Sequence, residues 1–258
     1  MFQTHLFKDK VALVTGGGSG IGYAIAAQLL RLGARVFIAS RTEERLKAAV
    51  ETLHALGPCE YFVCDIRLTA SIHAMAKEIK EKAGRLDILV NNAGGQFPIA
   101  AENLSENGWN AVINNNLNGT WYMSQIMAKA FFIPQQEGNI LNIIANIFRG
   151  FPGVVHTGAA RAGVDNFTKT LAVEWSKYNI RVNAVAPGFI QSSGLENYPP
   201  QLLQGVADKI PLRRLGTVDE VAWLTLFLVS PMAAFITGET VYVDGGQRLW
   251  GDVFTFMR

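Results

Sequence analysis

Short apolar runs alternate with longer helical stretches along almost the whole chain. Seven runs are nearly continuous in apolar residues instead of alternating apolar with polar positions: 11–15, 35–40, 60–65, 86–91, 139–144, 180–186 and 240–244. Strands that are buried on both faces of a parallel sheet have this unbroken character. Each run therefore predicts a strand in the interior of such a sheet.

The stretches between these runs are predicted helices. They cover 20–32, 42–56, 69–83, 105–131, 157–177 and 217–229. Alternating strands and helices form right-handed crossovers that place helices on both faces of the sheet. The sequence thus predicts an α/β fold, a single Rossmann-like, doubly wound domain over residues 1–258 with about seven parallel strands. An irregular segment at 188–216 interrupts the pattern, and we expect it to cover an active site as a lid.

Composition narrows the class of protein without identifying it. The 258 residues carry a net charge of +2 and are 49% hydrophobic. No run of basic residues is present, so nucleic acid is not an expected partner, and no metal site is predicted. The longest apolar run, 222–229, is far shorter than the ~20 residues of a membrane span. The two cysteines and the lack of an apolar signal core lead us to expect a reduced, cytoplasmic protein.

A glycine-rich turn follows the first predicted strand. The pattern is Thr15-Gly16-x-x-x-Gly20-x-Gly22, with Ser19 and Ile21 inside it, and a helix begins there. Glycines let the backbone approach a pyrophosphate, and the helix N-terminus adds free N–H groups and a positive dipole end. The order of strand, loop and helix predicts a dinucleotide site that contains Gly16, Ser19, Gly20, Ile21 and Gly22.

The end of the second predicted strand bears on the choice of cofactor. The strand ends in Ala39-Ser40-Arg41, with no acidic residue to bind both ribose hydroxyls of NAD. Ser40 and Arg41 can instead donate hydrogen bonds to a 2′-phosphate, which favours NADP(H). The alternative is that Arg41 is a solvated residue at the start of a helix.

Further motifs follow the other predicted strands. They are Cys64-Asp65-Ile66, Asn91-Asn92-Ala93-Gly94, Asn116-Leu117, Arg181-Val182-Asn183, Pro187-Gly188 and Val243-Asp244-Gly245-Gly246. With the glycine turn, they resemble the short-chain dehydrogenase/reductase family over about residues 8–246. The resemblance implies further cofactor contacts at Asp65, Ile66, Asn92, Ala93, Gly94, Arg161, Pro187, Gly188 and Ile190. It also implies a catalytic role for Asn116.

The pattern breaks at the catalytic positions of that family. In the usual mechanism a serine binds the substrate oxygen, a tyrosine protonates the alkoxide and a lysine lowers the tyrosine pKa. This chain has Ala145 in the serine position, Thr157 in the tyrosine position and Arg161 in the lysine position. Arg161 can still hold ribose hydroxyls, but Thr157 is a far weaker acid than a tuned tyrosine. Carbonyl reduction, which needs a proton for the new alkoxide, should suffer most.

Reduction of a conjugated thioester makes a different demand. Hydride reaches carbon, charge moves onto the thioester oxygen, and hydrogen-bond donors such as Thr157 or backbone N–H groups can stabilise the enolate. The segment 151–175 also resembles peroxisomal trans-2-enoyl-CoA reductases and, more distantly, 2,4-dienoyl-CoA reductases, which lack that tyrosine. We expect an NADPH-dependent 2-enoyl-CoA reductase. The alternatives are a 3-oxoacyl or other carbonyl reductase and a catalytically weak NADP-binding protein.

Several residues are open candidates for the proton donor. His156 either caps the long helix or faces the nicotinamide as a proton source. Asp165 either belongs to an ion-pair ladder with Arg161 and Lys169 or orients Arg161. The remaining acids are Tyr122, Tyr178 and Tyr198, each with a structural interpretation as well.

The irregular segment and the C-terminal tail contain the candidate residues for substrate binding and for subunit contacts. Apolar side chains there either line an acyl channel or pack a short helix: Leu195, Tyr198, Leu202, Leu203 and Val206. Arg149, Arg213 and Arg214 are available for the phosphates of an acyl-CoA partner. The resemblance implies a homodimer or homotetramer through the helices 105–131 and 157–177, with the tail aromatics Trp250, Phe254 and Phe256 packing across an interface.

Overall fold

The computed structural model describes residues 4–197 and 200–249. A parallel sheet of seven strands forms its centre, in the order β3-β2-β1-β4-β5-β6-β9. The strands are β1 Val11–Thr15, β2 Arg35–Ser40, β3 Cys59–Val63, β4 Ile88–Asn91, β5 Gly138–Ile143, β6 Ile180–Pro187 and β9 Thr240–Val243. The direction of winding reverses between β1 and β4, and ligands bind at such a switch point in open α/β sheets.

Burial on both faces explains the unbroken apolar strands. Successive side chains of a strand point to opposite faces. In β1, Ala12 and Val14 belong to the core on one side, whereas Val11 and Leu13 belong to the core on the other. All four are buried, so each of these positions is apolar, and the polar residue of the strand, Thr15, comes at its carboxyl end.

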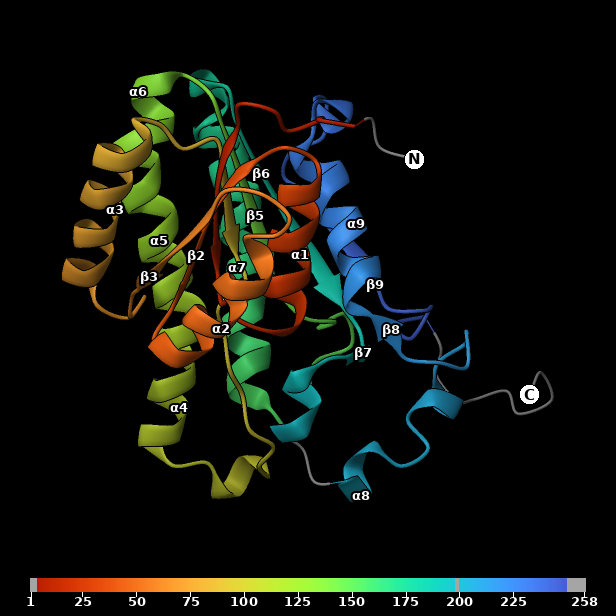
Figure 1. Ribbon diagram of the computed structural model, residues 1–258. Coiled ribbons are helices and arrows are strands. Elements are labelled where there is room, and N and C mark those ends of the chain that lie inside the picture. The colour runs from red at the N-terminus through yellow and green to blue at the C-terminus, as the bar shows by residue number, and fades with distance from the viewer. Residues whose placement is uncertain (1–3, 198–199, 250–258) are drawn as a thin grey trace.

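Two groups of helices cover the sheet (Figure 1). The helices α1 Gly20–Arg31, α2 Glu43–Leu53 and α9 Val218–Val229 pack on one face, and α3 Thr69–Ala83, α5 Gly119–Met127 and α7 Val155–Glu174 pack on the other. A capping box formed by Thr217 and Glu220 fixes the start of α9. The fold class predicted from the sequence is confirmed.

The long helix predicted at 105–131 differs from the observed structure. It consists of α4 Glu106–Ile113, α5 and α6 Ile133–Gln135, separated by π-helical turns at Asn114–Asn118 and Ala128–Phe132. A π turn adds a residue without changing the apolar character of the segment, so periodicity does not reveal it. Such turns are frequent at functional sites, and the first one contains Asn116.

The segment 188–216 has little regular structure. It contains the paired short strands β7 Ile190–Gln191 and β8 Gly216–Thr217, the helix α8 Pro200–Leu203 and two 3₁₀ turns, Ser193–Asn197 and Ala207–Lys209. It lies beyond the carboxyl end of the sheet (Figure 1). Within the described ranges, no helix has the length and apolarity required to cross a membrane.

Candidate active site

Two adjoining cavities open at the carboxyl ends of the strands. The first has a volume of about 770 Å³ and the second about 530 Å³. Residues that line both are Ile21, Asn92, Gly94, Ser192 and Gly194. The two cavities therefore form one continuous site along the sheet edge.

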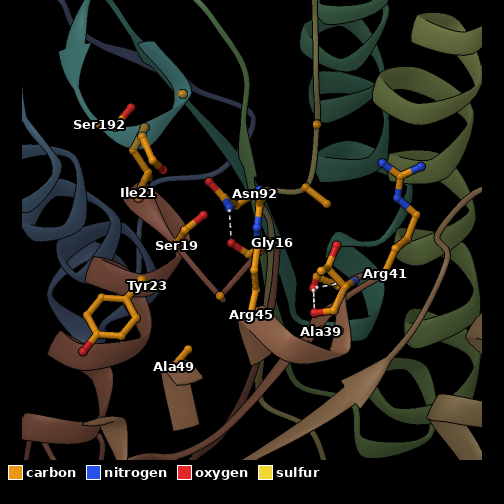
Figure 2. Close-up of a pocket in the computed structure, with 18 of the residues that line it drawn as sticks. Gly16, Ser19, Ile21, Tyr23, Ala39, Arg41, Arg45, Ala49, Asn92 and Ser192 are labelled. Carbon is orange, nitrogen blue, oxygen red and sulfur yellow. Dashed lines mark hydrogen bonds between the residues drawn. The ribbon is translucent and has the colours of Figure 1, made fainter. Parts of the chain in front are cut away.

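The glycine turn lines the first cavity, with Gly16, Ser19 and Ile21 labelled in Figure 2. Gly16 has φ +65°, which favours glycine, and a Cβ on it would lie 2.8 Å from the Asn92 amide nitrogen. Gly22 packs against the Gly16 carbonyl, where no side chain fits. The helix α1 begins here after Ser19, with no side-chain cap and no acidic residue in its first turn. Its N-terminal N–H groups are thus available to an anion.

The loop after β4 is bonded directly to that turn. The Asn92 amide donates to the carbonyls of Thr15 at 3.0 Å and Gly16 at 3.3 Å. The Thr15 hydroxyl accepts from the backbone N–H groups of Asn92 and Ala93, both at 3.0 Å. Neighbouring strands β1 and β4 therefore hold the two loops at a fixed separation.

A pair of arginines marks the far end of the first cavity. Arg41, which precedes α2, and Arg45, in its first turn, both line it together with Ser40. Both guanidinium groups are exposed, and neither donates a hydrogen bond to another residue in the described part of the chain. Asp65, in contrast, is held by Arg67 at 2.5 Å, which lowers the pKa of its carboxyl. Asp65 does not line the cavity, whereas its neighbour Ile66 does.

Arg161 is the buried cation of the second cavity. Its side chain is 7% exposed, and desolvation lowers the pKa of its guanidinium to about 10. Nη1 has no hydrogen-bond partner among the described residues. The guanidinium lies against Gly94, where a Cβ would collide with it. A charged donor is therefore held at the junction of the cavities without a protein acceptor for Nη1.

Asn116 positions the loop beside Arg161. Its amide donates to the Gly95 carbonyl and accepts from the Gly95 N–H, both at 3.0 Å. The side chain is 1% exposed and lines the second cavity from the π turn. Its contacts are with the backbone of the loop after β4.

Thr157 and His156 lie in the first turn of α7, outside the lining of either cavity. Nδ1 of His156 accepts from the Thr157 N–H at 2.8 Å and lies 3.3 Å from the Thr157 hydroxyl. The imidazole packs edge-on against Phe97, and burial lowers its pKa. The bond to the helix's own N–H agrees with the structural interpretation of His156. A threonine side chain is too short to extend where a tyrosine hydroxyl would.

Asp165 does not orient Arg161. Its carboxylate binds Lys169 at 2.5 Å and accepts from the Thr240 hydroxyl at 2.6 Å. No ion pair joins Asp165 to Arg161 in the described structure. The predicted Arg161–Asp165 pair is therefore wrong, whereas the Asp165–Lys169 pair is present. The Arg161 guanidinium lies against Gly94 instead.

The remaining candidate acids are tyrosines. Tyr122 and Tyr178 pack against the core, and no described tyrosine lines the second cavity.

Of the apolar side chains expected to contact the substrate, Leu195 and Leu203 line the second cavity, and Val206 does not. Tyr198, Trp250, Phe254, Phe256 and the side chain of Leu202 lie outside the described part of the chain. Arg214 is paired with Glu220 at 2.6 Å, and Arg149 donates to the Gln247 carbonyl.

The predicted cofactor residues are brought together at this edge of the sheet. Those that line the first cavity are Gly16, Ser19, Gly20, Ile21, Ser40, Arg41, Ile66, Asn92, Ala93 and Gly94. Those that line the second are Ile21, Asn92, Gly94, Arg161, Pro187, Gly188 and Ile190, with Asn116. Gly22 and Asp65 stand behind the lining.

Sequence reasoning missed Arg45 and Gln247. Its place four residues after Arg41, in the first turn of the helix that follows β2, could have indicated Arg45. No local pattern indicates Gln247, because the segment after β9 reaches the second cavity only through the folding of the whole chain.

The residues present fit a nicotinamide dinucleotide. An uncapped helix N-terminus suits the pyrophosphate, and the Arg161 guanidinium, buried without an acceptor for Nη1, suits ribose hydroxyls. The cavities together run from the arginine pair to Pro187 and Gly188. A doubly wound sheet that carries this turn and an Asn-Asn-Ala-Gly loop defines a dinucleotide-dependent reductase of the short-chain class.

Comparison with known proteins agrees with this class. A family model described as enoyl-(acyl carrier protein) reductase matches residues 16–248. The chain therefore belongs to this family of short-chain dehydrogenases/reductases, which are oxidoreductases.

Three relatives illustrate the range of the family. A probable 2,4-dienoyl-CoA reductase [(2E)-enoyl-CoA-producing] of Bacillus subtilis is 43% identical over 94% of this chain and 98% of its own. A 3-oxoacyl-[acyl-carrier-protein] reductase of Thermotoga maritima is 38% identical over 93% of this chain and 98% of its own. The crystal structure of a short-chain dehydrogenase from Bacillus anthracis superposes with a TM-score of 0.88, at 46% identity, over 93% of this chain and 97% of that one.

Proposed function

We propose that this protein uses NADPH to reduce a carbon–carbon double bond conjugated to the carbonyl of an acyl-CoA thioester. The substrate class is a 2-enoyl-CoA or a 2,4-dienoyl-CoA, which has one more conjugated double bond. The observation that carries the proposal is the lining of the second cavity, which holds Arg161 and Asn116 but no described tyrosine. The similarity to a probable dienoyl-CoA reductase supports the same reaction class.

The geometry suits a reaction that ends in an enolate. Bound NADPH supplies a hydride, which adds to the end of the conjugated system. The resulting negative charge lies on the thioester oxygen, where a fixed cation and hydrogen-bond donors lower its energy. With a pKa of about 10, Arg161 stays charged at neutral pH and provides that field at the junction of the cavities. The proton then goes to carbon, so no strong acid has to contact the oxygen.

Asn116 and Arg161 are the proposed catalytic residues that reach the cavity. Asn116 fixes the loop that carries Gly94 and Gly95, and Arg161 holds the ribose. Thr157 and His156 lie behind the cavity wall, so in this proposal they support the start of α7, and water in the cavity supplies the proton.

The choice of NADPH over NADH rests on the arginine pair. A 2′-phosphate at the far end of the first cavity would meet Ser40, Arg41 and Arg45, with no acidic side chain among the lining residues. Two guanidinium groups recognise a phosphate through charge-assisted hydrogen bonds.

A second candidate function is reduction of a 3-oxoacyl thioester. The Thermotoga maritima relative, named as a 3-oxoacyl-[acyl-carrier-protein] reductase, favours it. Ala145 in the second cavity and the position of Thr157 weigh against it, because neither supplies a proton to an alkoxide.

The test is NADPH oxidation with crotonyl-, decenoyl-, hexadienoyl- and acetoacetyl-CoA side by side. We expect turnover with the unsaturated thioesters and very little with acetoacetyl-CoA. Activity with acetoacetyl-CoA alone would overturn the proposal. Tight NADPH binding without turnover of any thioester would instead favour a catalytically weak NADP-binding protein.

We further propose that the protein assembles as a homodimer or homotetramer. Large apolar side chains remain exposed on its surface, among them Val173 of α7 at 76% and Trp223 of α9 at 51%. Light scattering of the purified protein tests this, and a monomer at micromolar concentration would contradict it.

A further inference from the structure

Gln247 brings an unpaired hydrogen-bond acceptor to the second cavity. The residue follows β9, and its side chain lines the cavity. Its Oε1 is shielded from solvent and has no hydrogen-bond partner among the described residues. Buried polar atoms in folded proteins are almost always paired, so an unpaired acceptor in a substrate cavity points to a donor on the ligand.

The backbone around Gln247 is held by a dense set of contacts. The Asp244 carboxylate accepts from the N–H groups of Gly246 at 3.0 Å and Arg248 at 2.9 Å. It also accepts from the Asn146 amide at 3.1 Å, which joins this turn to the segment after β5. Arg149 donates to the Gln247 carbonyl at 2.9 Å. The turn is therefore tied to the segment after β5, whose Asn146 also lines the cavity.

Close packing also holds the amide itself. A Cβ built on Gly188 would lie 2.9 Å from Oε1, so the oxygen sits directly over the bare backbone there. Gly188 lines the same cavity. The acceptor is thus fixed in position before any ligand binds, and it stays unpaired unless the ligand provides an N–H or O–H group.

Two unpaired buried atoms of the described residues belong to the lining of this cavity, and they have opposite hydrogen-bonding roles. Nη1 of Arg161 is a donor and Oε1 of Gln247 is an acceptor. The ribose hydroxyls of the cofactor can pair with Nη1, whereas a simple enone or ester has acceptors alone and leaves Oε1 unpaired. A thioester of pantetheine also carries an amide N–H, which lies a few bonds beyond the sulfur.

We propose that Gln247 Oε1 accepts a hydrogen bond from the pantetheine amide nearest the thioester, and so selects pantetheine thioesters over other conjugated carbonyl compounds. This inference rests on the proposed function, because it places a thioester in the second cavity. Gln247 is then a specificity-determining residue. A site built to bond an N–H group discriminates strongly against an analogue that lacks it, because the buried acceptor is left unpaired.

The test compares two small substrates that differ in one group. The crotonyl thioester of N-acetylcysteamine keeps the amide N–H, whereas the crotonyl thioester of 2-mercaptoethyl acetate has an ester oxygen there. We expect the wild-type kcat/KM to be at least about tenfold higher for the amide, a difference that corresponds to about 1.4 kcal/mol. Gln247→Leu should abolish this preference, and Gln247→Glu, which keeps an acceptor, should retain most of it.

Three outcomes would overturn the proposal. Equal wild-type kcat/KM for the two substrates would show that the amide N–H is not recognised. An equal loss for both substrates in Gln247→Leu would show a structural role. A weaker NADPH affinity in Gln247→Leu with the preference intact would assign the acceptor to the nicotinamide carboxamide.

Failure of the proposed function is a separate result. It would appear as no turnover of either crotonyl thioester or of crotonyl-CoA. The saturated butyryl thioesters of the same two thiols then give the comparison by calorimetry with the NADP⁺ complex. Tighter binding of the amide in the wild type, lost in Gln247→Leu, supports the inference without turnover, and equal binding contradicts it.

Discussion

At the scale of single residues, the site depends on where its positive charges lie. Arg161 is almost fully buried, whereas Arg41 and Arg45 are exposed at the other end of the site. A buried charge without a counter-charge destabilises the free protein, and a ligand that offers acceptors recovers part of that cost. Arg161 is therefore expected to contribute to cofactor binding more than either exposed arginine.

Replacing Arg161 tests this expectation. Arg161→Met should lower kcat/KM by about 10- to 100-fold, because a hydrogen bond to a charged donor contributes about 1.5–3 kcal/mol. Arg161→Lys keeps the charge and restores the residue usual in the family, so it should retain more activity. Steady-state kinetics and NADPH titration by fluorescence measure both effects. Equal activity of the Met and Lys variants would show that the charge is unimportant.

In the proposed function, the arginine pair sets the preference between NADPH and NADH. Arg41→Ala and Arg45→Ala should each raise the KM for NADPH about three- to tenfold, since solvent and salt screen both groups. The KM for NADH should change little, because it has no 2′-phosphate. The wild-type preference should also weaken as ionic strength rises. A matching rise in both KM values would place the arginines elsewhere in the site.

His156 predicts a pH dependence of stability. Burial lowers the pKa of its imidazole below the ordinary 6.5, so the unfolded chain binds a proton more readily than the folded one. Its contribution to the free energy of unfolding is complete above about pH 6.5 and is lost as the pH falls, by at most about 1.4 kcal/mol per pH unit.

Denaturant unfolding at about pH 7.5 and about pH 5.5 measures that loss. The wild type should lose more stability than His156→Gln, which cannot titrate. Identical losses would mean that the imidazole is protonated as easily in the folded protein as in the unfolded chain.

At the scale of elements, the π turn at Asn114–Asn118 is the feature that organises the second cavity. It turns Asn116 toward the loop after β4, where the amide bonds both polar atoms of the Gly95 backbone. The loop in turn presents Gly94 to the Arg161 guanidinium. One irregular turn thus couples two helices and a loop at the site.

Asn116→Ala should loosen that coupling. The loss of two buried hydrogen bonds is expected to cost about 1–3 kcal/mol in the free energy of unfolding and to weaken NADPH binding. Asn118→Ala is a matched control, because Asn118 lies in the same π turn but bonds Asn114 instead of the loop. Calorimetry and NADPH titration compare the two variants. The same loss of NADPH affinity in both would argue for a general effect on the helix.

The strands could be predicted because a strand buried on both sheet faces is an almost unbroken run of apolar residues. Most helices then followed as the stretches between these runs. Local order along the chain also predicted the glycine turn, and the family resemblance pointed to Asn92 and Arg161, which line the cavities. The sequence did not predict the π turn, since an added residue leaves the helical pattern intact. It misassigned Asp165, because helical spacing permits a pair with Arg161 that packing against Gly94 redirects.

At the scale of the whole molecule, the chain has the cofactor-lining residues of a short-chain reductase but lacks the tyrosine that acts as the acid in the family's usual mechanism. The glycine turn, the Asn-Asn-Ala-Gly loop and the segment Pro187–Ile190 meet as the fold class requires. Ala145 lines the second cavity, and Thr157 lies outside it. This arrangement suits binding of a dinucleotide but places no described tyrosine in the second cavity to protonate an alkoxide, which is the basis for the proposal that the protein reduces carbon–carbon double bonds.

The most direct measurement of that claim is a competition in one vessel. Equimolar hexadienoyl-CoA and acetoacetyl-CoA are incubated with the protein and limiting NADPH, and the products are identified by mass spectrometry. Competing substrates are consumed in the ratio of their kcat/KM values, so one experiment gives the discrimination. We predict that the dienoyl thioester gains two hydrogens at least about a hundredfold faster, a difference of about 2.7 kcal/mol in transition-state stabilisation. Preferential formation of 3-hydroxybutyryl-CoA would contradict the account.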